Sequence, residues 1–297
     1  MTAPRRIVPG TSYLASRRCS QREFLLKPSK LTNLVIRFVL AVAAARYGIL
    51  IHAVCVMSNH LHLVLTDPLG NLPEFSHLFF GVVAKALNAL HGRWENFWAP
   101  DSYSAVELVS PDDIVEKTAY TLANPAAADL VEHGRQWPGV WTAPHDIGGP
   151  AQAVKRPGHY FVEDGAMPKR AELVFTVPKG FASAEEFRAR VTARVKELEQ
   201  AAAEKREKAG KRVLGAHRVM KQKPTDRPTT GEPRRRLNPR VAAMDKWKRI
   251  EALQRLKSFL EAHREALLRF CGGDRAAVFP RGTYLMRVRF GVTCASG

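Results

Sequence analysis

Cysteine and long apolar runs are scarce in this chain, and each scarcity excludes a class of protein. Four cysteines stand among 297 residues, and none belongs to a CxxC pair or to the ligand spacing of a zinc knuckle. The longest apolar stretch, residues 34–45, is interrupted by Arg37 and is much shorter than the roughly 20 residues that span a bilayer. The N-terminus does not combine a basic start, an apolar core and a cleavage site. We therefore expect a reduced, cytoplasmic protein without a membrane span.

Acidic residues are scarce in the second half of the chain, and the resulting charge indicates the class of partner. Residues 1–150 contain 13 Lys and Arg against 12 Asp and Glu, whereas residues 151–297 contain 33 against 16. The second half therefore carries nearly all of the formal net charge of +18, and a polyanion is the expected partner. The basic helices expected there lack a Trp/Phe/Leu stripe opposite their basic face, which favours nucleic acid over a membrane surface.

The overall composition predicts a folded protein with two parts. Hydrophobic residues make up 45% of the chain and charged residues 25%, as in ordinary globular proteins. We expect one domain over residues 1–150 and a basic accessory region over residues 151–297. The accessory region is expected to be mostly helical, with a Pro/Arg-rich linker near residues 221–240.

Periodicity in the first half alternates between that of helices and that of strands. Ser29 and Gly48 flank one helical pattern as N-cap and C-cap candidates. Ser110 is a further N-cap candidate, and Pro125 is expected to end the helix that Ser110 starts. The expected elements are a strand or hairpin within residues 11–26, a helix 29–47, strands 49–57 and 60–66, a helix 71–90, a strand 104–108 and a helix 110–124. This order predicts an α+β fold with an antiparallel sheet covered by helices.

The second half contains fewer strand patterns. We expect a strand at 172–177, a charged helix at 184–211 and a second amphipathic helix at 241–270. The apolar segment 276–292 is expected to pack against another element or another chain.

Two histidines in an alternating strand pattern are the first candidates for chemistry. In His60-Leu61-His62 the two imidazoles point to one face, about 6.7 Å apart, while Leu61 points to the other. Both imidazoles can then bind one metal ion, because neutral His is a common metal ligand. The alternative is a pair of surface histidines without a ligand. His52, on the preceding strand, is interpreted as a core or edge histidine.

A tyrosine on the helix after Ser110 is the second candidate. Tyr120 falls outside the arc of apolar residues on this helix, and Asn124 lies one turn later beside it. Lys117, one turn earlier, is placed to lower the pKa of the tyrosine or to contact phosphate. The alternative is a surface tyrosine near a helix end, next to a solvated lysine.

Together the two motifs resemble a known family. Residues 57–65 (MSNHLHLVL), followed about sixty residues later by residues 120–125 (YTLANP), resemble the single-tyrosine HUH transposases, and among them the REP-associated branch. The resemblance covers about residues 4–145.

The resemblance implies a ferredoxin-like core, with helices on one face of an antiparallel sheet, and a DNA nickase and transposase. It implies that His60, His62 and Asn124 hold Mg or Mn against the scissile phosphate. Tyr120 would then attack to give a covalent 5′-phosphotyrosine and a free 3′-hydroxyl. The substrate would be single-stranded or hairpin DNA, and the protein a monomer or homodimer. Exchange of one phosphoester for another needs no nucleotide hydrolysis, and the sequence has no GxxxxGK[ST] loop.

Basic residues near an aromatic residue in the second half are candidate DNA contacts. Arg234, Arg235 and Arg236 stand in the expected linker, and Trp247 stands at the start of the following helix. Such residues track a phosphate backbone and stack on bases. The alternative is a solvated linker and a solvated charged helix.

Three functional interpretations stay open from the sequence. The first is the transposase that the resemblance implies. The second is a catalytically silent DNA-binding regulator of palindromic repeat elements on the same fold. The third is a metal-dependent hydrolase in which the histidine pair activates water and Tyr120 is incidental. A covalent protein–DNA adduct is expected only of the first.

Overall fold

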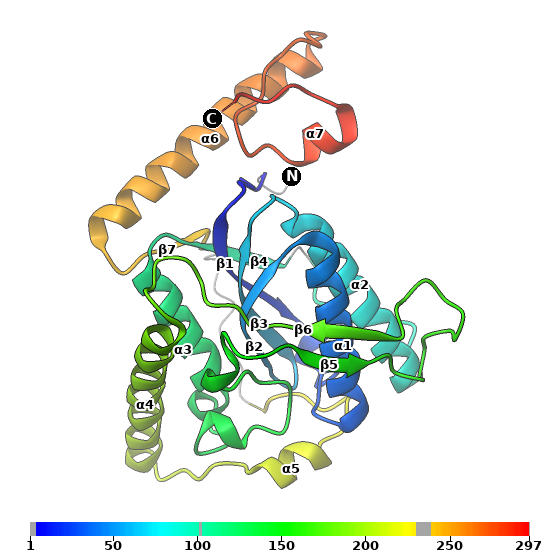
Figure 1. The fold of residues 1–297 in the computed structure, drawn as a ribbon, viewed down its shortest axis with the longest axis vertical. Coiled ribbons are helices and arrows are strands. Elements are labelled where there is room, and N and C mark those ends of the chain that lie inside the picture. The colour runs from blue at the N-terminus through cyan, green and yellow to red at the C-terminus, as the bar shows by residue number, and fades with distance from the viewer. Residues whose placement is uncertain (1–3, 101–102, 230–238, 297) are drawn as a thin grey trace.

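A central sheet organises the chain, and the computed structural model describes residues 4–100, 103–229 and 239–296 (Figure 1). The helices and strands are, in chain order, β1 (Thr11–Arg18), α1 (Lys30–Tyr47), β2 (Leu50–Val56), β3 (His60–Asp67), α2 (Leu72–His91), β4 (Ser104–Leu108), α3 (Pro111–Ala127), β5 (Gln152–Lys155), β6 (Arg170–Leu173), α4 (Ala184–Lys208), α5 (Ala216–Lys221), β7 (Val241–Ala242), α6 (Lys246–Cys271) and α7 (Leu285–Phe290). No helix within these three ranges is long and apolar enough to cross a membrane.

The central sheet has the strand order β2-β3-β1-β4-β7. Its first four strands are antiparallel to their neighbours, whereas β7 pairs in parallel with β4. One helix joins β1 to β2 and another joins β3 to β4, which together with this strand order makes the first four strands ferredoxin-like. The predicted α+β fold is confirmed, but the sheet is mixed rather than purely antiparallel, because the short parallel strand β7 from the second half joins it.

Helices lie on both sides of this sheet. Helices α1 and α2 pack against each other on one side, and α3 contacts β2 and β3 from the other (Figure 1). Helix α4 packs along α3 on its outer side. This arrangement leaves the side of β3 that carries the two histidines facing the tyrosine helix.

Local capping explains where the first helices begin and end. The Ser29 hydroxyl accepts a hydrogen bond from the Thr32 N–H, and Gly48 ends α1 in the left-handed conformation with φ of 67°. Ser110 and Asp113 form a capping box at the start of α3. These three predicted helix boundaries are confirmed.

The predicted end of α3 is wrong, because Pro125 lies inside the helix. Proline removes one helical hydrogen bond, but the Ala128 N–H still donates to the Asn124 carbonyl at 3.0 Å. The Trp141 indole N–H also donates to the carbonyl of Leu122 at 2.9 Å. Packing on both sides of α3 thus keeps the helix intact through the proline.

The main hydrophobic core continues past residue 150. Val154 of β5, Leu173 of β6 and Phe187 of α4 belong to the same buried cluster as the first-half residues. Strand β6 begins two residues before the predicted strand and pairs with β5, which the sequence patterns do not predict. The two-domain division near residue 150 stays a prediction.

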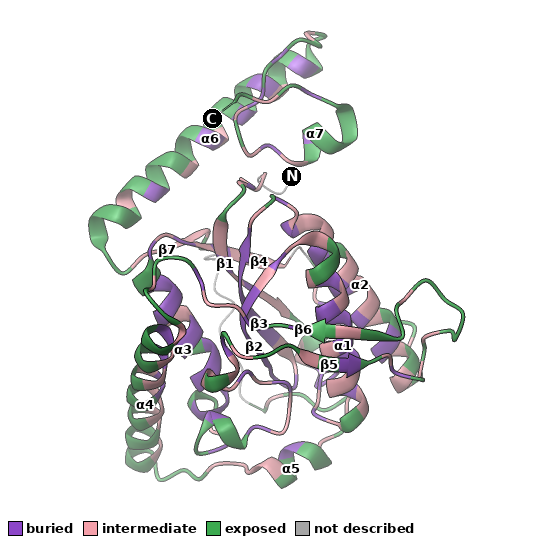
Figure 2. Ribbon diagram, in the orientation of Figure 1, coloured by how far each residue is buried: buried purple, intermediate pink, exposed green. Residues whose placement is uncertain are grey.

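The C-terminal region differs from its prediction at one boundary. The predicted helix at 241–270 is a strand, β7, followed by α6, because the Asp245 carboxylate caps a helix that starts at Lys246. The apolar tail packs against the end of α6, where Phe270, Phe279 and Met286 form a small separate core. Figure 2 shows that most of α6 away from this end is exposed.

Candidate active site

Strand β3 and helix α3 bring the three predicted aromatic site residues together. The ring centroids of His60 and His62 are 4.9 Å apart, and those of His62 and Tyr120 are 5.5 Å apart. Both contacts are edge to face. His62 and Tyr120, which are far apart in the sequence, thus meet on one side of the sheet.

His62 is buried and electrically neutral at physiological pH. Burial, with smaller effects of His60 and of the Arg18 guanidinium, lowers the pKa of His62 to about 3. Its Nδ1 atom is buried and has no hydrogen-bond partner among the described residues. A buried polar nitrogen without a partner is costly, and a metal ion or a water would supply one. The observation fits the ligand role that the resemblance implies for His62.

His60 is oriented by its neighbour. Its Nδ1 lies 2.7 Å from the Asn59 side-chain oxygen, so Nδ1 is the donor, and in a neutral imidazole this leaves the lone pair on Nε2. A hydrogen bond at one imidazole nitrogen commonly orients the other toward a metal. Arg18 on β1 lies directly opposite His60 in the antiparallel register, a neighbour that the sequence patterns do not reveal.

Tyr120 is accessible and has a cation beside it. Its side chain is 41% exposed, and the Lys117 ammonium lies 5.6 Å from the centre of its ring. The ammonium therefore lies within cation–π distance of the ring. Asn124, one helical turn on, is buried. Helix α3 therefore presents the tyrosine to solvent and its amide neighbour to the interior.

The donor set available to a metal is small. No group of three or more His, Cys, Asp or Glu side chains that could hold a metal occurs in the described part of the chain. If the two imidazoles and the Asn124 amide oxygen bound a metal ion, its remaining coordination positions would be open to water or to substrate oxygens. Open positions of this kind are typical of catalytic rather than structural metal sites.

Helix α4 holds the tyrosine helix in place through a ladder of ion pairs. Arg190 pairs with Asp112, and Arg194 donates from Nε to the Glu116 carboxylate at 2.7 Å. Near the other end of the helix, Arg206 donates to Asp129 at 3.2 Å. In each pair the two residues are 77 or 78 positions apart in the sequence, so later residues of α4 pair with later residues of α3. The two helices therefore run parallel.

The predicted DNA contacts fall in three places. Lys117 lies beside Tyr120, as described above. Trp247 is 73% exposed at the start of α6, with the Lys246 ammonium 5.7 Å from its ring. Arg234, Arg235 and Arg236 lie outside the described residues.

Comparison with known proteins gives structural likenesses. No family model and no curated protein matches this sequence. The chain is similar to a REP-associated tyrosine transposase bound to a REP hairpin, with 18% identity and a TM-score of 0.42, over 49% of this chain and 85% of the other. It is also similar to a Deinococcus radiodurans R1 protein described as a "putative transposase", with 21% identity and a TM-score of 0.28, over 36% of this chain and 85% of the other.

Proposed function

We propose that this protein is a metal-dependent, single-tyrosine DNA nickase and transposase. It would cleave and rejoin single-stranded or hairpin DNA in the cytoplasm through a covalent 5′-phosphotyrosine. The observation that carries the proposal is the contact between the Tyr120 ring and His62, which lies beside His60 and whose buried Nδ1 has no hydrogen-bond partner among the described residues. This contact joins a nucleophile to two candidate metal ligands.

The chemistry follows from this arrangement. The Tyr120 oxygen attacks the scissile phosphorus, the bond from phosphorus to the 3′ oxygen breaks, and the proton lost by tyrosine balances the one gained by the 3′-hydroxyl. Lys117 favours the ionised nucleophile. His60, His62 and Asn124 would hold a divalent cation, which supplies charge withdrawal from the phosphoryl oxygens when bound. The 3′-hydroxyl can later reverse the step, since both bonds are phosphoesters.

Covalent capture tests the nucleophile. Wild-type protein is incubated with labelled hairpin and single-stranded oligonucleotides and Mn or Mg, and the products are separated on a denaturing gel. We expect a protein–DNA adduct that Tyr120→Phe abolishes while hairpin affinity persists. Tyr160→Phe is the matched control, because Tyr160 has similar exposure on the loop between β5 and β6, and it should retain the adduct.

The same assay tests the metal and the competing functions. Chelation by EDTA, and separately His62→Gln, should abolish the adduct without abolishing hairpin binding. Adduct formation in EDTA would contradict metal dependence. Salt-sensitive binding without an adduct under any metal would support the regulator, and cleaved DNA without an adduct would support the hydrolase.

A further inference from the structure

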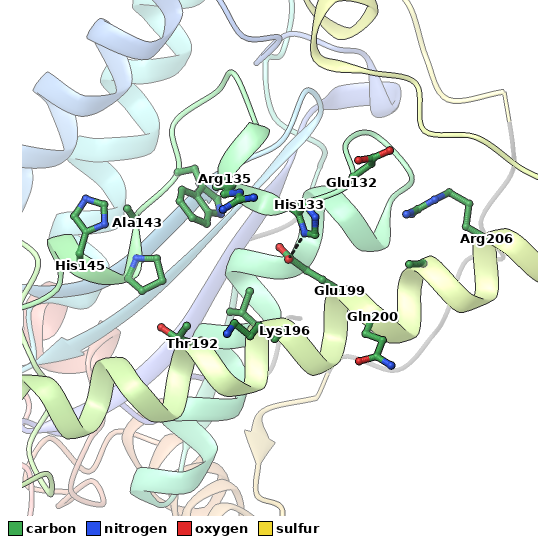
Figure 3. A pocket seen from close by; sticks show the side chains of 14 residues that line it. Glu132, His133, Arg135, Ala143, His145, Thr192, Lys196, Glu199, Gln200 and Arg206 are labelled. Atoms are coloured by element: carbon green, nitrogen blue, oxygen red, sulfur yellow. Dashed lines mark hydrogen bonds and ion pairs between the residues drawn. The ribbon is translucent and has the colours of Figure 1, made fainter.

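A cavity of about 770 Å³ lies between α4 and the segment that follows α3. Figure 3 shows Glu199 of α4 reaching His133, with Arg135 and His145 on the segment and Thr192 and Lys196 on the helix. The proposed chemistry at Tyr120 uses none of these side chains. The cavity is therefore a second candidate site.

Basic side chains outnumber carboxylates in the lining of the cavity. The Glu199 carboxylate accepts hydrogen bonds from the His133 ring at 2.8 Å and from the Gly134 N–H at 2.7 Å. Arg135 and Lys196 form no ion pair within the described ranges, and both are exposed. Arg206 also lines the cavity, and its partner Asp129 lies outside the lining. Arg135, Lys196 and Arg206 thus outnumber the two lining carboxylates, Glu132 and Glu199, and this balance favours an anionic ligand.

A fixed indole forms part of the same wall. Trp141 is half-buried, and its N–H donates to the carbonyl of Leu122, two residues after Tyr120. Gly134 permits this packing, since a Cβ there would lie 2.3 Å from the Leu122 oxygen and 3.1 Å from the indole nitrogen. A rigid aromatic surface beside lysine and arginine is the combination that binds a base and its phosphate.

We propose that this cavity binds an unpaired nucleotide of the DNA substrate, with its base against Trp141 and its phosphate near Arg135 and Lys196. The inference rests on the proposed function for the identity of the polyanion, and it names where a single strand lies. The Trp141 indole is hydrogen-bonded to the helix that carries Tyr120, so a DNA strand bound against this indole lies next to that helix.

Binding measurements without cleavage test the site. In a Tyr120→Phe background without metal, fluorescence anisotropy compares a blunt hairpin with the same hairpin carrying a short single-stranded tail. We expect the tail to improve affinity by about tenfold, and Arg135→Gln with Lys196→Gln to remove most of that gain. Lys205→Gln is the matched control, because Lys205 is exposed on α4 outside the cavity, and it should keep the gain.

Photocrosslinking locates the tail independently of affinity. A tail with 5-iododeoxyuridine should crosslink to the peptide that contains Trp141, and free deoxynucleoside monophosphates should compete poorly. Crosslinks confined to other peptides, equal tail affinity in the double variant, or monophosphates that bind as tightly as the tail would each overturn the proposal.

The two proposals fail separately. Tail binding at the cavity without any Tyr120 adduct in the wild type would refute the cleavage chemistry alone. A Tyr120 adduct with unchanged tail affinity in the Arg135 and Lys196 double variant would refute the nucleotide site alone.

Discussion

His52 is a buried histidine that the proposed chemistry does not use, and its burial predicts that the stability of this protein depends on pH. The His52 ring nitrogens lie 2.8 Å from the Thr66 hydroxyl and 2.8 Å from the Thr176 carbonyl. Burial lowers the pKa of His52 to about 4, and the Thr176 hydrogen bond opposes this only in part. His52 is thus a core histidine, as the sequence analysis allowed, and it joins β2 to β3 and to the segment after β6.

Protonation of His52 should destabilise the fold in mild acid. Between pH 6.5 and pH 4 the unfolded chain binds a proton at this histidine and the folded chain does not. His52 should therefore contribute a fall of about 3 kcal/mol to the free energy of unfolding as the pH drops through this window. Urea denaturation of the wild type and of His52→Gln at several pH values checks this. The variant should show a shallower decline, and equal declines would contradict the assignment.

Short-range patterns predicted the residues at the proposed active site, but not their partners. Strand alternation and helical periodicity placed His60, His62 and Tyr120 on the facing surfaces where the structure has them. The contacts of Trp141 with Leu122 and of Glu199 with His133 span 19 and 66 residues. Such contacts depend on the path of the whole chain, and no local spacing encodes them.

At the scale of elements, α4 belongs to the same core as the sheet. Phe187 is fully buried, and its ring packs edge-on against Phe181 at 4.7 Å. Phe187→Ala should lower the free energy of unfolding by about 3 to 5 kcal/mol, because it leaves a cavity in the main core. Urea denaturation measures the loss. Val162→Ala, at a side chain 73% exposed, should change stability by less than about 0.5 kcal/mol.

If Phe187→Ala destabilised only α4, the result would contradict a core shared by α4 and the sheet. In that case circular dichroism would show partial melting of helix, while the rest of the protein kept the wild-type denaturation midpoint. A single cooperative transition is the expected result.

Helix and strand boundaries differ from those predicted where tertiary contacts override local preference. Pro125 normally disfavours helix, yet packing of α3 between the sheet and α4 keeps it helical. Val241 and Ala242 have the apolar character of the helix that follows, but they pair with Glu107 and Leu108 on β4. Both outcomes depend on neighbours more than 50 residues away in the sequence.

At the scale of the molecule, the net charge of +18 predicts salt-sensitive DNA binding. Each phosphate neutralised by Lys or Arg releases counterions, so affinity should fall by at least about tenfold between about 50 and about 200 mM salt. Anisotropy titrations over a salt series measure the slope. A flat salt response would contradict binding through the phosphate backbone.

Trp247→Ala should weaken the binding of single-stranded DNA by about fivefold without changing the slope of affinity against salt, because base stacking releases few ions.

Strand β7 also has a protective consequence. It covers the end of the β4 edge at Glu107 and Leu108, and the Glu107 N–H donates to the Arg240 carbonyl at 2.9 Å. A chain truncated before residue 240 would present that edge unpaired, and an open edge strand is a template for pairing with another copy. The C-terminal segment should therefore limit pairing between copies of the protein, and its loss by proteolysis should reduce solubility.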